Sequence, residues 1–204
     1  MTNQPATYHH GDLRAALLVE AADMVSEGGV ASVTMRAIGQ RLGVSRAAPY
    51  RHFADKAALL DAVASAGFNR LKDRIQAIAG VAPGPSLERL QHLGEEYVRF
   101  ALENPAHYRL MYGKEALTRE DRPELREAAN ALFEEFVDVI QAHQRSGAIK
   151  QHDPRTQAYV AWSAVHGLAS LLIEGQIRAI VDVDELIRET TQTLLDGMRI
   201  RLSG

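Results

Sequence analysis

Cysteine is absent from the 204 residues of this chain, and so are long apolar runs. The lack of cysteine excludes disulfides, thiolate zinc sites and cysteine nucleophiles, and it permits a reducing compartment. No apolar run approaches the ~20 residues that cross a bilayer, and the first ten residues are too polar for a signal peptide. We therefore expect a soluble, cytoplasmic protein with no membrane partner.

Signatures of catalysis and of metal binding are missing as well. The eight histidines form no His-Glu-x-x-His pattern, and no glycine-rich phosphate loop follows a strand. Ser163 and His166 lie close in sequence, but no nearby acid would orient the histidine. We expect neither an enzyme nor a cofactor, and no catalytic or metal-binding residue.

The alternating β-branched pattern of strands is also missing, while glycine and proline fall between segments of helical periodicity. The sequence predicts an all-α fold of about nine helices, four before residue 80 and five after it. The run "GVAPGP" separates the two sets. We expect a helix-turn-helix domain over 10–56, a connecting fourth helix over about 55–79, and a C-terminal domain over 86–204.

Charge is unevenly distributed along a chain whose net charge is −3. Residues 34–56 hold five basic side chains and one acid, a net charge of +4, which leaves −7 for the rest. A basic segment joined to an acidic body is common where a DNA-binding domain is attached to another domain. A solvated charged face would account for the same residues, so charge alone does not decide.

Residues 34–53 have the pattern of a helix-turn-helix, which needs a small residue, an apolar plug and a cap in its turn. A plain helical hairpin would show part of the pattern, but the full set together with the local positive charge favours DNA binding. The residues in these roles are Ile38 and Leu42 in the supporting helix, Gly43, Val44 and Ser45 in the turn, and Tyr50 and Phe53 in the next helix.

Three stretches extend this pattern into a family resemblance: "LLVEAADMVSEGG", "VTMRAIGQRLGVS" and "PYRHFADKAALLDAV". With them, residues 12–60 resemble the N-terminal domain of the tetracycline-repressor-like (TetR/AcrR) regulators. The resemblance implies an all-α dimeric transcription regulator. Such a protein would bind a roughly palindromic operator in double-stranded DNA, with one reading helix per half-site.

Four residues match positions that would contact the phosphate backbone in this family. Tyr50, His52 and Lys56 are three of them. The fourth is Thr34, which would direct its hydroxyl and the free N–H groups of a helix start at a phosphate. The alternatives are that Tyr50 covers the core and that Lys56 is merely solvated.

Arg46, Ala47 and Ala48 match positions at or beside the bases. Arg46 would bind guanine O6 and N7, whereas the two alanines offer only methyl groups to thymine. Pro49 lacks the N–H that would bond to the Ser45 carbonyl, a loss of ~3 kcal/mol in a helix interior and less in a first turn. We expect a helix that starts irregularly at 46–48 and becomes regular over 49–53.

The predicted helix over 154–174 is apolar nearly all round, so it would be buried on several sides. In the family that the first domain resembles, the last two helices of each subunit form a four-helix dimer interface. The resemblance therefore implies a homodimer. The residues expected at its interface are Ala161, Val165, Leu168, Leu172, Leu194 and Met198. Ile187 of the last helix also offers apolar surface, but we do not assign it to the interface.

The strings "AWSAVHGL" and "YRLMYG" resemble a Trp-x-x-x-His-Gly subgroup of the family. The residues that could line an effector pocket there are Tyr108, Met111, Tyr112, Trp162 and His166. The alternative is a Trp–His pair in the core. A sizeable cavity within 86–175 would favour a repressor released by a small apolar or amphipathic effector. A solid core would favour a regulator controlled by a protein partner, or one that acts constitutively.

Overall fold

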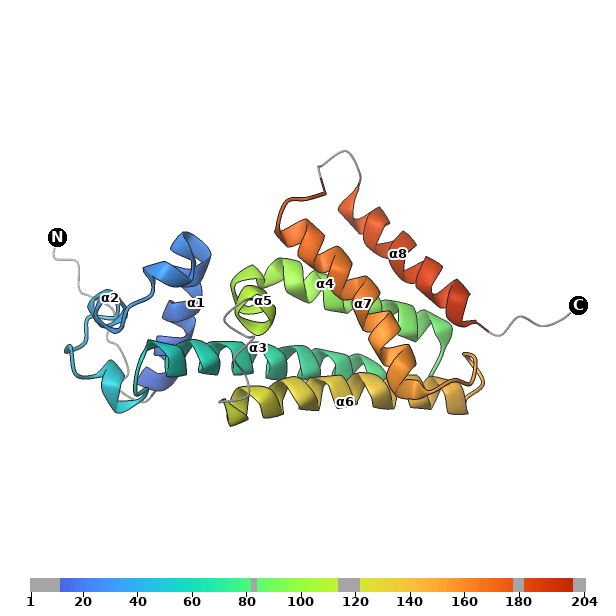
Figure 1. The fold of residues 1–204 in the computed structure, drawn as a ribbon, viewed down its shortest axis with the longest axis horizontal. Coiled ribbons are helices and arrows are strands. Elements are labelled where there is room, and N and C mark those ends of the chain that lie inside the picture. Colours follow the sequence, from blue (N-terminus) through green and yellow to red (C-terminus); the bar gives the residue numbers. More distant parts are fainter. Residues whose placement is uncertain (1–11, 82–83, 114–121, 178–181, 200–204) are drawn as a thin grey trace, which may run out of the picture. The chain divides into compact units, whose positions relative to one another are not determined.

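The computed structural model describes residues 12–81, 84–113, 122–177 and 182–199 (Figure 1). Across those ranges the chain is helical, and the single β pairing is an isolated antiparallel bridge between Ile149 and Arg199. The all-α prediction is therefore confirmed. The helices are α1 (Leu13–Ser32), α2 (Met35–Arg41), α3 (Lys56–Ala79), α4 (Leu87–Glu103), α5 (Pro105–Tyr112), α6 (Pro123–Arg145), α7 (Pro154–Ile173) and α8 (Val183–Met198).

The predicted third helix is a 3₁₀ turn of three residues, η1 (Pro49–Arg51). The described residues thus form eight α-helices and one 3₁₀ turn rather than nine helices. The chain divides into two compact units, residues 1–64 and 65–204, called here the first and second unit. Helix α3 begins in the first unit and ends in the second.

Side-chain caps start six of the helices. In five of them a side-chain oxygen accepts a hydrogen bond from the backbone N–H three residues later, at Asp12 (2.9 Å), Thr34 (3.1 Å), Asp55 (2.8 Å), Ser86 (3.2 Å) and Asp153 (2.7 Å). Asp182 caps the sixth, α8, where its carboxylate accepts from the N–H groups of Asp184 and Glu185. Because a cap needs only residues within one turn, these starts are readable from sequence.

Asn104 precedes Pro105, a pair that is typical of a capped helix start, but the Asn104 side chain does not cap α5. The amide nitrogen instead donates to the Phe100 carbonyl at the end of α4 (2.9 Å), and Arg70 donates to the amide oxygen (3.1 Å). The side chain therefore stabilises the end of one helix rather than the start of the next.

Gly28 and Gly29 are of the residue type that commonly ends a helix, but in α1 they form a kink. Gly29 has φ of 72°, yet helical hydrogen bonding resumes and runs to Ser32. The Ser32 hydroxyl lies 2.8 Å from the Met24 carbonyl and 2.7 Å from the Gly29 carbonyl, which holds the last turn against the helix. The glycines break the helix without ending it.

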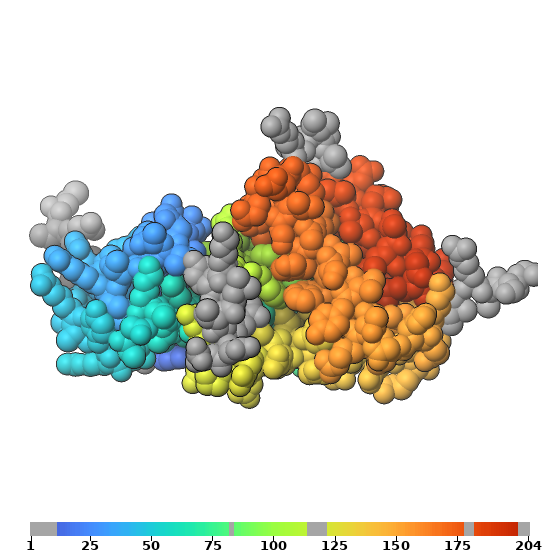
Figure 2. Space-filling model, in the orientation of Figure 1, coloured from blue at the N-terminus to red at the C-terminus, as the bar shows by residue number. Residues whose placement is uncertain are grey.

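The second unit is built around α4, which packs against α7 and α8, while α6 packs against α7. Helices α7 and α8 lie side by side on the face shown in Figure 2, in orange and red. Lys150, in the chain after α6, holds the end of α8 with two hydrogen bonds. Its backbone N–H donates to the Met198 carbonyl and its ammonium group donates to the Gly197 carbonyl, both at 2.9 Å. This arrangement brings α4, α5 and α7 together around an aromatic cluster.

Candidate DNA-binding surface and aromatic cluster

The turn after α2 has the geometry that a helix-turn-helix requires. Gly43 has φ of 67°, a left-handed conformation that favours glycine. The next residue, Val44, is half-buried, and its N–H donates to the Gly39 carbonyl at 2.9 Å. Gly43 and Val44 therefore take the roles of bend and plug that the sequence predicts.

Pro49 is accommodated by a change of hydrogen-bonding pattern. The Ser45 carbonyl accepts from the Ala48 N–H at 3.0 Å, so it does not depend on the N–H that proline lacks. The same i+3 pattern continues from Ala48 to Arg51 and from Pro49 to His52. The irregular start at 46–48 is confirmed, whereas the regular helix expected over 49–53 is wrong, because 3₁₀ bonding persists through Arg51.

The proline ring also has a packing role that sequence reasoning missed. Pro49 is buried, and a Cβ added to Gly39 of α2 would lie 3.3 Å from the Pro49 Cγ. The ring therefore fits against a helix surface that carries no side chain. This close approach fixes η1 against α2. Pro49, which the sequence predicts to destabilise a helix, therefore stabilises the packing of the turn.

The residues predicted to meet DNA are mostly exposed. Arg46, Ala47 and His52 are exposed, and Ala48 is half-buried. Tyr50 is 56% exposed, so it does not cover the core. Phe53 is buried, as expected for a core residue. An exposed turn that ends on a buried anchor is suited to contact a large partner.

Thr34 and Lys56 have partners within the first unit. The Thr34 hydroxyl oxygen accepts from the Ala37 N–H, and its own hydrogen can still be donated to a phosphate. The Lys56 ammonium donates to the Val30 carbonyl at 2.6 Å, and an ammonium has three hydrogens to donate. Both side chains can therefore keep their hydrogen bonds within the first unit and still donate to a phosphate of DNA.

One of the five basic residues in 34–56 is neutralised within the unit. Arg41 forms ion pairs with Glu20 and with Glu27, the latter at 2.7 Å, and its hydrogen bond holds the pKa of the Glu27 carboxyl below its usual value. The positive charge available to DNA therefore comes from the other four residues, which are Arg36, Arg46, Arg51 and Lys56.

The second unit contains a hydrogen-bonded aromatic cluster, defined as Tyr97, Tyr108, Tyr112, Trp162 and His166. Tyr108 Oη lies 2.6 Å and Tyr97 Oη 3.1 Å from His166 Nδ1, and the Trp162 indole N–H donates to Tyr97 Oη at 2.9 Å. The Tyr112 ring meets the His166 ring edge-on, with centroids 4.7 Å apart. Four of the five predicted effector residues thus meet, together with Tyr97, which the sequence analysis did not single out.

Met111, the fifth of those residues, is fully buried against α3. A Cβ added to Gly67 would lie 2.7 Å from the Met111 Sδ, so α5 and α3 approach each other closely at this glycine. Met111 therefore joins the two helices that carry Tyr112 and Phe68, whose rings also meet edge-on at 5.4 Å.

Burial favours the uncharged forms of three members of the cluster, Tyr97, Tyr108 and His166. Burial lowers the pKa of the His166 imidazole below its ordinary value, and it raises the pKa of Tyr108 to about 12. Burial also raises the pKa of Tyr97 well above its ordinary value. The imidazole is therefore neutral, and its Nδ1 is satisfied by tyrosine hydroxyls within the chain.

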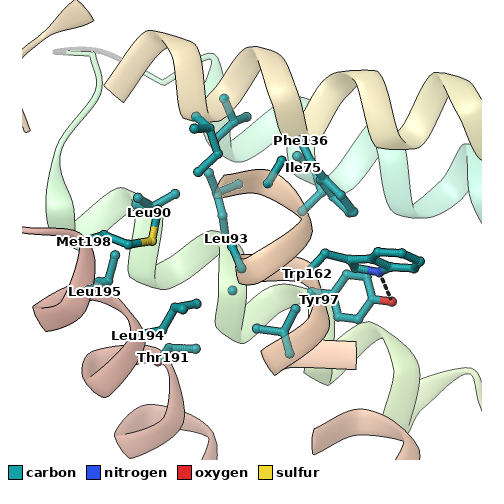
Figure 3. A pocket seen from close by; sticks show the side chains of 16 residues that line it. Ile75, Leu90, Leu93, Tyr97, Phe136, Trp162, Thr191, Leu194, Leu195 and Met198 are labelled. Carbon is teal, nitrogen blue, oxygen red and sulfur yellow. Dashed lines mark hydrogen bonds between the residues drawn. The ribbon is translucent and has the colours of Figure 1, made fainter. Parts of the chain in front are cut away.

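A small apolar cavity of about 70 Å³ adjoins the cluster (Figure 3). Trp162 and Tyr97 form one end of it, and Leu194, Leu195 and Met198 of α8 line another side. Small-molecule pockets usually measure ~300–1,000 Å³. As it stands, this cavity is smaller than an effector pocket of ordinary size.

The residues predicted for a dimer interface are divided between core and surface. Val165, Leu168 and Met198 are buried within a single chain, while Ala161, Leu172 and Leu194 are half-buried. The large apolar side chains that α7 leaves exposed are not among these residues; they are Tyr159 (48%), Val160 (56%) and Leu171 (47%).

Ile187 of α8, which the sequence analysis left out of the expected interface, is a core residue. Its side chain is 1% exposed within the single chain. The Thr191 hydroxyl, one turn later, donates to the Ile187 carbonyl at 3.0 Å. The apolar surface that this residue offers is therefore used inside the chain, and an interface on α8 needs other residues.

Comparison with known families decides the class of the protein. Residues 17–63 match the family of bacterial regulatory proteins called tetR, and residues 90–194 match the tetracyclin repressor-like C-terminal domain. The chain belongs to the TetR family. This TetR-family chain is therefore a DNA-binding transcription regulator and not an enzyme.

Relatives of this TetR-family chain include two nucleoid occlusion factors named SlmA. SlmA of Vibrio vulnificus is 33% identical over 139 residues, which span 68% of this chain and 69% of that protein. SlmA of Marinobacter nauticus is 31% identical over 182 residues, which span 89% of this chain and 87% of that protein.

Solved structures agree with the family assignment. A protein of unknown function from Rhodococcus sp. RHA1 is 33% identical, with a TM-score of 0.85 over 96% of this chain and 100% of the other. A TetR-family transcriptional regulator from Pectobacterium atrosepticum is 25% identical, with a TM-score of 0.69 over 93% of this chain and 95% of the other.

In the described part of this TetR-family chain, helices that could span a membrane and clusters that could bind a metal are both absent. None of the helices there is long and apolar enough to cross a membrane. None of the groups of histidine, aspartate and glutamate there could hold a metal ion.

Proposed function

We propose that the protein is a homodimeric repressor that binds a palindromic operator and is released from it by a small-molecule effector. The observation that carries this proposal is the segment 45–52, in which most side chains are exposed and which the buried residues Pro49 and Phe53 hold on a helix-turn-helix. A rigid scaffold beneath exposed basic and hydroxyl side chains is what groove reading requires.

The contacts to DNA divide into two kinds. Arg46 reads a guanine, and the methyl groups of Ala47 and Ala48 pack against thymine. The phosphate contacts come from Thr34, Tyr50, His52 and Lys56, which set the orientation of the turn on the duplex. Because one arginine supplies the hydrogen-bonded readout of each half-site, DNA shape contributes a large share of the specificity.

Release would depend on α3, the helix that begins in the first unit and ends in the second. Effector binding in the second unit would shift α3, and the two reading heads of the dimer would lose the spacing that fits successive major grooves. The close approach of α5 to Gly67 of α3 supports this route, because a movement of α5 would displace α3 directly.

The dimer would form through α7 and α8 of each subunit. Because Val165, Leu168 and Met198 pack within one chain, the exposed Val160 and Leu171 are the apolar side chains that a second copy would cover on α7. A sedimentation experiment on the full chain tests this step, and a monomer at micromolar concentration would contradict it.

A second candidate is a regulator controlled by a protein partner. Two observations favour this second candidate: the 33% identity to a nucleoid occlusion factor, and the small volume of the inner cavity, about 70 Å³. A regulator that is controlled by a protein partner needs no pocket for a small effector. Reciprocal coupling separates the two candidates. For the repressor, a compound that weakens operator binding must bind less tightly, by the same factor, in the presence of operator DNA.

Selection of genomic fragments by the purified protein tests the main proposal. We expect recovered fragments to share an inverted repeat, with half-sites about one helical turn apart. Recovery of fragments without a common sequence, at equal affinity, would contradict an operator-binding function.

A further inference from the structure

The second unit contains a hollow of about 240 Å³ that is separate from the small cavity and larger than it. Helices α3, α5, α6 and α7 all contribute to its walls. Six aromatic rings line it: Phe68, Tyr112, Phe133, Phe136, Tyr159 and Trp162. A dry cavity of about 150 Å³ takes up benzene, so this hollow has room for one or two fused rings.

The rings present both faces and edges. Phe133 and Tyr159 are stacked, with centroids 4.2 Å apart and planes inclined by 30°. Trp162 meets Phe133 edge-on at 6.1 Å. Tyr159 is 48% exposed, so the stacked pair stands at the rim with part of its surface open to solvent. Aromatic partners in such arrangements gain energy beyond the area that they bury, and a flat ring uses them best.

The charged groups at the rim cancel each other. Arg155 lies over the Phe133 ring at 5.6 Å, and its Nη2 donates to both carboxylate oxygens of Glu134, at 2.9 and 2.7 Å. This ion pair gives no net attraction to an anion or a cation. The other guanidinium N–H groups of Arg155, and the Asn130 amide, can still bond to an oxygen on a neutral ligand.

We propose that this aromatic hollow binds an uncharged planar compound of one or two fused aromatic rings that carries a hydroxyl or carbonyl oxygen. The compound stacks on the Phe133–Tyr159 pair, and its oxygen meets Arg155. That it also acts as the effector rests on the function proposed above.

A ligand in the hollow would contact two residues of the aromatic cluster, Trp162 and Tyr112. Trp162 lines both the hollow and the inner cavity, and its indole N–H is bonded to Tyr97. Tyr112 lines the hollow and contacts His166. Because Trp162 is the single tryptophan of the chain, tryptophan fluorescence reports on this region alone.

Calorimetry on the full-length protein tests the proposal with two probes of one skeleton, 2-naphthol and its saturated analogue decahydro-2-naphthol. We expect 2-naphthol to bind at least about tenfold more tightly, since the saturated rings cannot stack. Equal affinities, or no binding of 2-naphthol up to its solubility limit, would overturn the proposal.

Variants at the exposed rim test the location without disturbing the core. Tyr159→Ala should weaken 2-naphthol binding about tenfold, whereas Tyr159→Phe should retain it. Asp138→Ala, at an exposed position of α6 outside the hollow, is the control and should bind like the parent protein. Unchanged binding by Tyr159→Ala, or an equal loss in Asp138→Ala, would place the ligand elsewhere.

The effector role is tested separately, with the operator fragment selected above. If 2-naphthol binds but leaves operator affinity unchanged, the binding site stands and the release mechanism fails. If the protein selects no operator, the proposed function fails while the calorimetric result still decides the site.

Discussion

The two units place their candidate functional residues in opposite environments. In the first unit, Arg46, Tyr50 and His52 are exposed on a short turn that bonds only to its own neighbours in sequence. In the second unit, Tyr97, Tyr108 and His166 are buried or half-buried and bond across 58 to 69 residues. A surface that reads a large ligand can be built locally, whereas a buried polar cluster needs several helices to be in place.

This difference predicts that operator binding by the first unit depends most strongly on the packing between η1 and α2. Gly39→Leu places a side chain where Pro49 already lies, because even a Cβ there is 3.3 Å from the Pro49 Cγ. Overpacking of this kind costs about 1–3 kcal/mol, and displacement of η1 should reduce operator affinity about 100-fold or more. Titration of operator DNA, with chemical unfolding in parallel, gives both quantities.

Gln40→Leu is the matched control, since Gln40 is the next residue of α2 and is exposed. It should lose little affinity and little stability. If Gly39→Leu bound operator as tightly as Gln40→Leu does, the proline packing would have no part in holding the turn.

The second unit should instead be sensitive to the loss of single hydroxyl groups. Tyr108→Phe removes the oxygen that lies 2.6 Å from His166 Nδ1. Loss of a buried hydrogen-bond partner costs about 1–3 kcal/mol, and we expect that loss in urea unfolding of the second unit. Tyr159→Phe, at a ring that is 48% exposed, should cost much less. Equal losses in the two variants would show that the cluster adds nothing to stability.

A smaller effect should follow from acidification. Because burial depresses the folded-state pKa of His166, the unfolded chain binds more protons below the ordinary histidine pKa of about 6.5. The stability that the neutral imidazole provides is complete above that pH and declines as the pH falls toward the folded-state pKa. In urea unfolding, His166→Gln should therefore lose less stability than the parent between about pH 7 and pH 5.5. An identical decline in both proteins would contradict burial of the imidazole.

Sequence alone predicts what depends on neighbouring residues. The caps at Asp12, Thr34 and Asp153, the bend at Gly43 and the exposed turn all follow from local patterns, and the structure contains them. Most helix boundaries follow for the same reason.

What sequence does not predict depends on distant partners. The Asn104 side chain is held by Arg70, 34 residues earlier in the chain. Tyr97 joins the cluster through Trp162 and His166, 65 and 69 residues later. Pro49 fits against Gly39 only because the turn folds back on α2. Periodicity identified the apolar faces of α7 and α8 without showing which of them pack inside one chain.

Direct reading of bases by the turn can be tested with Arg46→Ala, through its effect on base preference. Binding should be measured to the selected operator and to the four bases at each half-site position. We expect the variant to lose discrimination at one base pair per half-site, a loss of about 1–3 kcal/mol, and to keep its preferences elsewhere. A uniform loss of affinity for all sequences would show that Arg46 contacts phosphate, and it would contradict direct reading by this turn.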